Sequence, residues 1–297
     1  MAVSHIYAPH KRRRTTTVSI RGIDYAIHEW GEPGQPNFVY LHGFFDCAAT
    51  FQLVVDALGG DWHVIAPDLR GFGDSHGPVA GYWFPDYLAD LDAILARFCP
   101  DEPARLVGHS MGANVAGLYA GAFPERVRAF VNIEGFGLAD SDPADAPARY
   151  RHWIESTREP RALPVYDDFA ALAERICARN PRIERSAAEF VARCWGREED
   201  GKVRLAADPA HRRVNPILYR RAEAEACWRA VAAPVRVIAG SNSEFAKAAD
   251  ERLGVGSVDL PFANATLEVI DGAGHMLHFD EPRRLAAAIE AFLAEHL

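Results

Sequence analysis

The pentapeptide Gly108-His109-Ser110-Met111-Gly112 places the tightest constraint on how this chain can fold. It follows a short apolar run, 104–107, and opens a stretch of small residues, 113–122, which predicts a strand, a sharp turn and a helix. A serine at such a turn has a strained backbone, and glycines beside it remove Cβ atoms that would clash with the neighbouring strand and helix. The Ser110 hydroxyl is then exposed beside a helix N-terminus, whose free N–H groups favour developing negative charge.

Length, charge and cysteine content limit the class of protein. The 297 residues are 49% hydrophobic, which is enough for one large core or a core with an inserted segment. A formal net charge of -9 argues against nucleic acid or an anionic membrane as a main partner. The five cysteines are scattered without C-x-x-C spacing, and the sequence has no apolar leader or membrane-length stretch. We therefore expect a reduced, cytoplasmic protein whose partner is a small-molecule substrate.

Apolar runs separated by helical patterns occupy most of the chain. Alternation over 18–20 and 23–30 predicts an antiparallel pair of strands at the start. Later strands are predicted from short apolar runs typical of parallel strands covered on both faces: 38–41, 63–66, 104–107, 129–133, 235–239 and 267–270. Helical patterns lie between most of them, at 48–58, 82–98, 111–122 and 283–297. This order predicts an α/β fold with a mostly parallel central sheet flanked by helices.

One interval, 136–232, breaks the alternation, because it contains helical patterns and no convincing strand. We expect it to be an inserted helical cap with helices near 149–157, 167–180, 186–195 and 216–232. Residues 1–135 and 233–297 then form the core, and residues 1–15, which include a basic run, form a flexible tail. A cap over the carboxyl ends of the strands would cover the place where open α/β sheets bind ligands.

Further motifs in the right order resemble the α/β-hydrolase family. Leu-His-Gly-Phe at 41–44 follows the third predicted strand, and Asp-Leu-Arg-Gly-Phe-Gly-Asp-Ser at 68–75 follows the fourth. Gly-Ala-Gly-His at 272–275 comes near the end of the chain. The likeness runs from about residue 18 to the C-terminus, and it implies the α/β-hydrolase fold with nucleophile, acid and histidine in that chain order.

A serine nucleophile needs a base, because its hydroxyl is a poor nucleophile near neutral pH. Histidine has an unperturbed pKa close to neutral, so we expect His275 to serve Ser110 as base. The resemblance also implies that the backbone N–H groups of Met111 and Phe44 stabilise an oxyanion. We expect no cofactor, and no metal site follows from the sequence, which lacks H-E-x-x-H or comparable spacing.

The acid departs from the common family pattern. Many members carry Asp three residues beyond the glycine that ends the strand after the cap, but here Ser243 holds that position and Glu244 follows it. Some haloalkane-dehalogenase-like members instead carry the acid at the end of the strand before the cap, where this chain has Glu134. A lone Glu at the tip of an apolar strand would be costly to bury without a partner such as an imidazole N–H. We therefore favour Glu134 over Glu244.

These residues predict a serine hydrolase that acts on a carboxylic ester, lactone or thioester of small or medium acyl size. Because one fold hosts many reactions, a C–C bond hydrolase, a lyase and a cofactor-free peroxidase remain alternatives. A non-catalytic protein that binds a small ligand is a further alternative. The sequence fixes neither the substrate nor the oligomeric state.

Overall fold

The computed structural model describes residues 6–77, 81–158, 162–253 and 261–297. Within these residues an eight-stranded sheet has the order β1-β2-β4-β3-β5-β6-β10-β11. Its strands are β1 (Arg14–Ile20), β2 (Ile23–Trp30), β3 (Asn37–Leu41), β4 (His63–Pro67), β5 (Ala104–His109), β6 (Val127–Ile133), β10 (Val235–Gly240) and β11 (Ala265–Ile270). Strands β1 and β2 are antiparallel, β2 pairs antiparallel with β4, and the remaining pairs are parallel. The predicted α/β fold class is confirmed.

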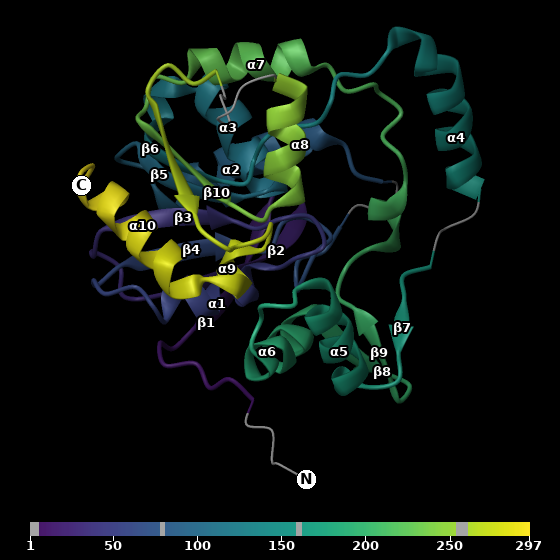
Figure 1. Ribbon diagram of the computed structural model, residues 1–297, viewed down its shortest axis with the longest axis horizontal. Helices are drawn as coiled ribbons and strands as arrows, with labels where there is room; N and C mark the ends of the chain where they lie inside the picture. Colours follow the sequence, from purple (N-terminus) through teal and green to yellow (C-terminus); the bar gives the residue numbers. More distant parts are fainter. Residues whose placement is uncertain (1–5, 78–80, 159–161, 254–260) are drawn as a thin grey trace.

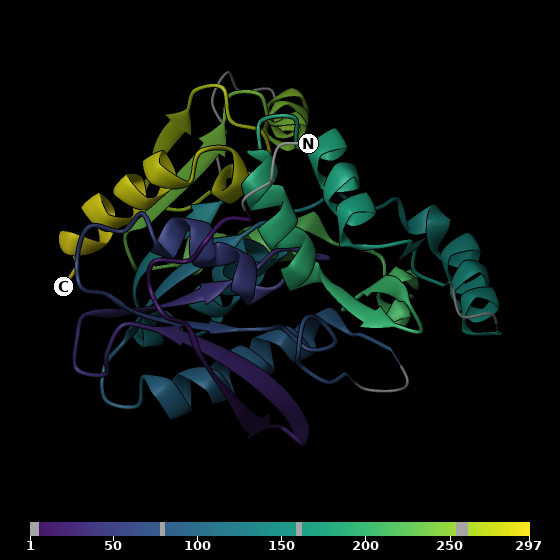
Figure 2. The same ribbon diagram turned by 90° about the horizontal axis from the view of Figure 1, so that it is seen from below.

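Helices cover both faces of this sheet (Figures 1 and 2). One face packs on α2 (Phe84–Phe98), α3 (Met111–Ala122) and α7 (Arg221–Ala230). The other packs on η1 (Ala48–Phe51), α1 (Gln52–Val55), α9 (Leu277–Asp280) and α10 (Pro282–Ala294). Neighbouring residues of β5 divide between the two layers, with Leu106 in the first and Val107 in the second. Apolar residues on both faces explain why these strands are continuous apolar runs in the sequence.

Most of the interval expected to form a cap lies to one side of the sheet in both views (Figures 1 and 2), whereas α7, at the end of that interval, packs on the sheet. It contains η3 (Pro143–Asp145), α4 (Ala146–Arg158), α5 (Phe169–Arg179), α6 (Arg185–Trp195) and η4 (Pro209–Arg212). It also contains a small antiparallel sheet of β7 (Val165–Tyr166), β8 (Gly196–Glu199) and β9 (Lys202–Leu205). The expectation of no strand in this interval was therefore wrong. These strands have only two to four residues, so any alternation in them is too short to distinguish a strand in the sequence.

The remaining elements are short or were not predicted. The 3₁₀ turn η2 (Pro124–Arg126) precedes β6, and helix α8 (Glu244–Leu253) lies between β10 and β11. No helix among the described residues is both long enough and apolar enough to cross a membrane.

The N-terminal segment corrects a second expectation. Residues 1–5 lie outside the described residues, but the backbone N–H of Tyr7 donates to Ser186 O at 3.1 Å and its hydroxyl donates to Asp56 at 2.8 Å. The N–H of Lys11 donates to the same carboxylate at 2.6 Å, and β1 begins at Arg14. The tail predicted over residues 1–15 is thus held against the core from Tyr7 onward, because Asp56 accepts several of its donors.

The close approach of α3 to β3 gives a test of how the turn at Ser110 is held. A Cβ added at Gly112 would lie 2.2 Å from the backbone O of Leu41, so Gly112→Ala must displace the helix or the strand. We expect it to lower the free energy of unfolding by about 1–3 kcal/mol, as overpacking does. In Gly59→Ala the nearest heavy atom would be 3.5 Å away, so this control should stay within about 0.5 kcal/mol of wild type. Urea denaturation of both variants measures the difference, and equal stabilities would contradict the tight contact.

Candidate active site

Ser110 occupies the strained turn that the sequence predicts. It lies between the end of β5 and the start of α3, and its backbone has φ 51° and ψ -112°. Its N–H donates to Ile133 O at 2.8 Å, which ties the turn to the end of the neighbouring strand β6. A non-glycine residue with positive φ is costly and persists only where the surrounding structure holds it. The turn therefore presents the Ser110 hydroxyl at the carboxyl edge of the sheet.

His275 joins Ser110 to Glu134. Its Nε2 lies 3.0 Å from Ser110 Oγ, and its Nδ1 lies 3.0 Å from Glu134 Oε2. With the proton on Nδ1, the imidazole donates to the carboxylate and leaves Nε2 free to accept the serine proton. The ring of Phe245 stacks on the imidazole at a centroid distance of 4.1 Å. The structure thus brings together three of the side chains predicted from the sequence.

The Glu134 carboxylate is buried, and three hydrogen bonds from two segments satisfy it. Its Oε1 accepts from the N–H of Gly240 at 2.8 Å, and its Oε2 accepts from the Ser243 hydroxyl as well as from His275. The side chain is fully covered, so a charge there is affordable only with such partners. The backbone of Glu134 also has positive φ, 58°, at the point where the chain leaves β6. Such a backbone is costly, and the hydrogen bonds of the carboxylate together with that from the Glu134 N–H to Ile238 O hold it in place.

Glu244, the alternative acid, lies elsewhere. It is the exposed first residue of α8, and no hydrogen bond within the described residues joins it to His275. Ser243, in the position where many family members have Asp, is fully buried and donates to Glu134. The sequence analysis noted Ser243 but missed this contact. Its position three residues beyond Gly240 was the available signal.

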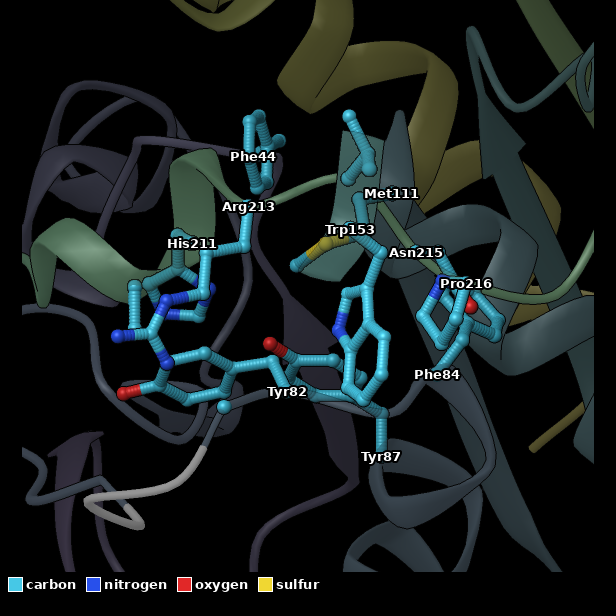
Figure 3. A pocket seen from close by; sticks show the side chains of 13 residues that line it. Phe44, Tyr82, Phe84, Tyr87, Met111, Trp153, His211, Arg213, Asn215 and Pro216 are labelled. Atoms are coloured by element: carbon cyan, nitrogen blue, oxygen red, sulfur yellow. The ribbon is translucent and has the colours of Figure 1, made fainter. Parts of the chain in front are cut away.

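Phe44 and Met111 line one cavity of about 140 Å³ (Figure 3). Met111 is the first residue of α3, so its N–H has no acceptor within the helix. The loop that carries Phe44 is braced by His42, whose Nδ1–H donates to Gly43 O and whose Nε2 accepts from the N–H of Leu69, both at 2.8 Å. Both residues expected to supply oxyanion donors therefore lie beside the same open space.

Two buried histidines lie behind His275. Burial lowers the pKa of His109 well below its usual value, so the neutral ring donates from Nε2 to the backbone O of His275 at 2.9 Å. His278 Nε2 lies 3.0 Å from Asp46 Oδ2. Burial alone would raise the pKa of Asp46, but hydrogen bonds from His278 and Trp195 lower it further than burial raises it. These contacts fix the loop that carries His275.

Two groups of residues are close enough to hold a metal ion. One is Asp46, His109 and His278, and the other is His28, Asp68 and Asp74, with potential ligand atoms within 4.8 Å of one another in each group. Each already contains an Asp–His hydrogen bond, at 3.0 and 3.1 Å. These bonds account for the buried positions of both pairs, and the sequence analysis predicted neither group.

The cavity wall contains an imidazole that the sequence analysis did not single out. His211 stacks between Phe72 and Tyr82, with centroid distances of 3.8 and 3.5 Å. Burial lowers the pKa of His211 to about 4, against a smaller opposing effect of Asp208. The ring is therefore neutral near pH 7 and behaves as part of an aromatic wall.

The comparisons with known proteins agree with this architecture. A family model described as "alpha/beta hydrolase fold" matches residues 36–282. A serine hydrolase-like protein of Danio rerio is 29% identical over 180 residues, 58% of this chain, and the chain spans only 55% of that protein. A 2-(acetamidomethylene)succinate hydrolase of Mesorhizobium japonicum is 29% identical over 263 residues, 87% of this chain and 88% of that protein. A solved thioesterase domain from the curacin biosynthetic pathway shares the fold, with a TM-score of 0.84, 23% identity and coverage of 94% of this chain and 99% of that chain.

The lowered pKa of His211 predicts how stability depends on pH. Unfolded histidine has a pKa of about 6.5, so below that pH the unfolded chain binds a proton that the folded chain excludes until about pH 4. The free energy of unfolding should fall across this window, by up to ~3 kcal/mol from this residue. His211→Phe keeps an aromatic ring in the stack and removes the titration, so its stability should fall less steeply.

Urea denaturation at intervals from pH 7 to pH 4.5 measures this slope. The control is His76→Phe, whose side chain is 78% exposed and which should follow the wild-type slope. Parallel curves for wild type and His211→Phe would show that His211 does not titrate in this way.

Proposed function

Since this chain belongs to the α/β-hydrolase family and is a serine hydrolase-like enzyme, we propose that it cleaves a carboxylic ester, lactone or thioester of small or medium acyl size. The observation that carries the proposal is the pair of 3.0 Å contacts that link Ser110 to His275 and His275 to Glu134. A hydroxyl, an imidazole and a carboxylate in this order form the arrangement that activates serine for acyl transfer.

In the proposed reaction Ser110 Oγ attacks the substrate carbonyl while His275 Nε2 accepts its proton. His275 then returns that proton to the leaving group, and an ester between Ser110 and the acyl group remains. Water, deprotonated by His275, attacks this ester, and His275 returns the proton to Ser110 Oγ as the acid is released. Glu134 stabilises the imidazolium that forms at each step and keeps the Nδ1–H directed toward itself.

The negative charge that develops on the carbonyl oxygen needs fixed donors. The N–H groups of Met111 and Phe44 are proposed for this role, because both residues line the cavity next to the Ser110 turn. The N-terminus of α3 adds the favourable end of its dipole. Loss of one such donor typically costs about a hundredfold or more in rate.

A cytoplasmic location fits the chemistry of the cysteines. All five lie within the described residues and are unpaired. Burial raises the pKa of Cys47, Cys99 and Cys194, which keeps their thiols protonated. We propose a reducing compartment on this basis.

A fluorophosphonate probe tests the nucleophile. We expect peptide mass mapping to find the probe on Ser110 of the wild type and to find almost none on His275→Ala, because the hydroxyl then lacks its base. His76→Ala, at an exposed histidine, should label like wild type. Labelled enzyme that turns over no 4-nitrophenyl ester of any acyl length would favour C–C bond hydrolysis or another reaction. An unlabelled wild type would favour ligand binding without catalysis.

The choice of acid has its own test. Glu134→Gln replaces the carboxylate, which only accepts, by an amide that can also donate to His275 Nδ1. The imidazole can then carry its proton on Nε2, where it cannot accept the serine proton. The kcat for a 4-nitrophenyl ester should therefore fall by about 10³–10⁴-fold. Glu244→Gln is the matched control and should retain wild-type kcat, since that side chain is exposed. A large loss in Glu244→Gln with little loss in Glu134→Gln would reverse the assignment.

A further inference from the structure

Aromatic rings form much of the wall of the cavity that Met111 lines. Six of its thirteen lining residues carry them: Phe44, Tyr82, Phe84, Tyr87, Trp153 and His211 (Figure 3). They come from four separate parts of the chain, namely the loop after β3, the start of α2, helix α4 and the turn η4. Because these segments are far apart in the sequence, the aromatic wall forms only when the chain folds. No local sequence pattern indicates it.

Several of these rings are fixed in orientation. The Tyr82 hydroxyl donates to Asp208 at 2.8 Å. This hydrogen bond fixes the orientation of the Tyr82 ring, whose face is then free to contact other rings. His211 lies flat against that ring, and Phe44 meets His211 edge-on at 6.0 Å with an interplanar angle of 88°. Fixed faces and edges favour a flat ligand ring, because aromatic pairs prefer offset-stacked and edge-to-face contacts.

The size of the cavity fits one ring. Its volume of about 140 Å³ is close to that of an engineered apolar protein cavity of about 150 Å³ that binds benzene. Phe44 and Trp153 are exposed, at 52% and 36%. A ring in the cavity would cover apolar surface of both.

The position of the cavity assigns that ring to one side of the scissile bond. The leaving group must face His275, which returns a proton to it. Met111 and Phe44, whose N–H groups are proposed to hold the carbonyl oxygen, line the cavity, whereas Ser110, His275 and Phe245 do not. The cavity thus adjoins the proposed oxyanion donors rather than the base that protonates the leaving group, and this position suits the acyl part of the substrate.

We propose that the enzyme prefers acyl groups that carry an aromatic ring close to the scissile carbonyl, such as phenylacetyl. This inference rests on the proposed function, since it assigns the acyl group of the same reaction. A saturated ring of similar size fills the same volume but lacks a π face. It should lose the ring-to-ring part of the binding, which corresponds to a factor of about two to ten for one aromatic pair.

The experiment compares kcat/KM for 4-nitrophenyl phenylacetate and 4-nitrophenyl cyclohexylacetate. Each value is divided by the rate constant of the same ester with hydroxide, which removes the difference in intrinsic reactivity. We expect the corrected ratio to favour phenylacetate by about two- to tenfold or more in the wild type. In Trp153→Leu the ratio should move toward one, because one ring of the wall is lost.

Trp83→Leu is the matched control. Trp83 is 57% exposed, does not line the cavity, and should keep the wild-type ratio. Helix α4 buries none of its residues, so Trp153→Leu should fold, and circular dichroism checks this.

The outcomes separate the two proposals. Turnover of both esters with a corrected ratio near one, or a ratio that Trp153→Leu leaves unchanged, would overturn the aromatic preference while the esterase reaction stands. Failure to cleave either ester, or any other 4-nitrophenyl ester, would overturn the proposed function and this inference with it.

Discussion

The buried carboxylate of Glu134 holds the site together. It lies at the end of β6 and accepts hydrogen bonds from Gly240 at the end of β10, from Ser243 before α8, and from His275 after β11. Two loops that are distant in sequence, the one between β10 and α8 and the one after β11, are thereby fixed to the end of β6. Because an unpaired buried charge is costly, the same contacts that orient His275 also keep the carboxylate in place. Stability and proposed catalysis depend here on one set of hydrogen bonds.

Ser243 stands at the position where many family members carry the acid. Its hydroxyl donates to Glu134, so this position supports the proposed acid without supplying it. The parallel sheet makes this exchange possible, because β6 and β10 are neighbours and end at the same edge. A carboxylate on either strand end could reach the imidazole, and in this chain the one on β6 does.

Most local elements of the fold and of the candidate site could be predicted from the sequence. Contacts between segments that are far apart in the sequence could be predicted less well. The Ser110 turn and α3 follow from glycines and small residues, and Glu134 is the lone charge at the tip of an apolar strand. The contact between Ser110 and His275 spans 165 residues, and the family resemblance supplied it rather than the local pattern. Strands β7 to β9 were missed because they are short, and the His211 stack was missed because it depends on how residues far apart in the sequence fold together.

Ser110 is proposed to carry the acyl group between the two halves of the reaction. Rapid mixing with 4-nitrophenyl acetate, followed by acid quench and peptide mass mapping, tests this directly. We expect an acetyl group on Ser110 of the wild type, and neither the acetyl group nor appreciable turnover in Ser110→Ala. Turnover that persists in Ser110→Ala, or an acetyl group mapped to another residue during wild-type turnover, would contradict it.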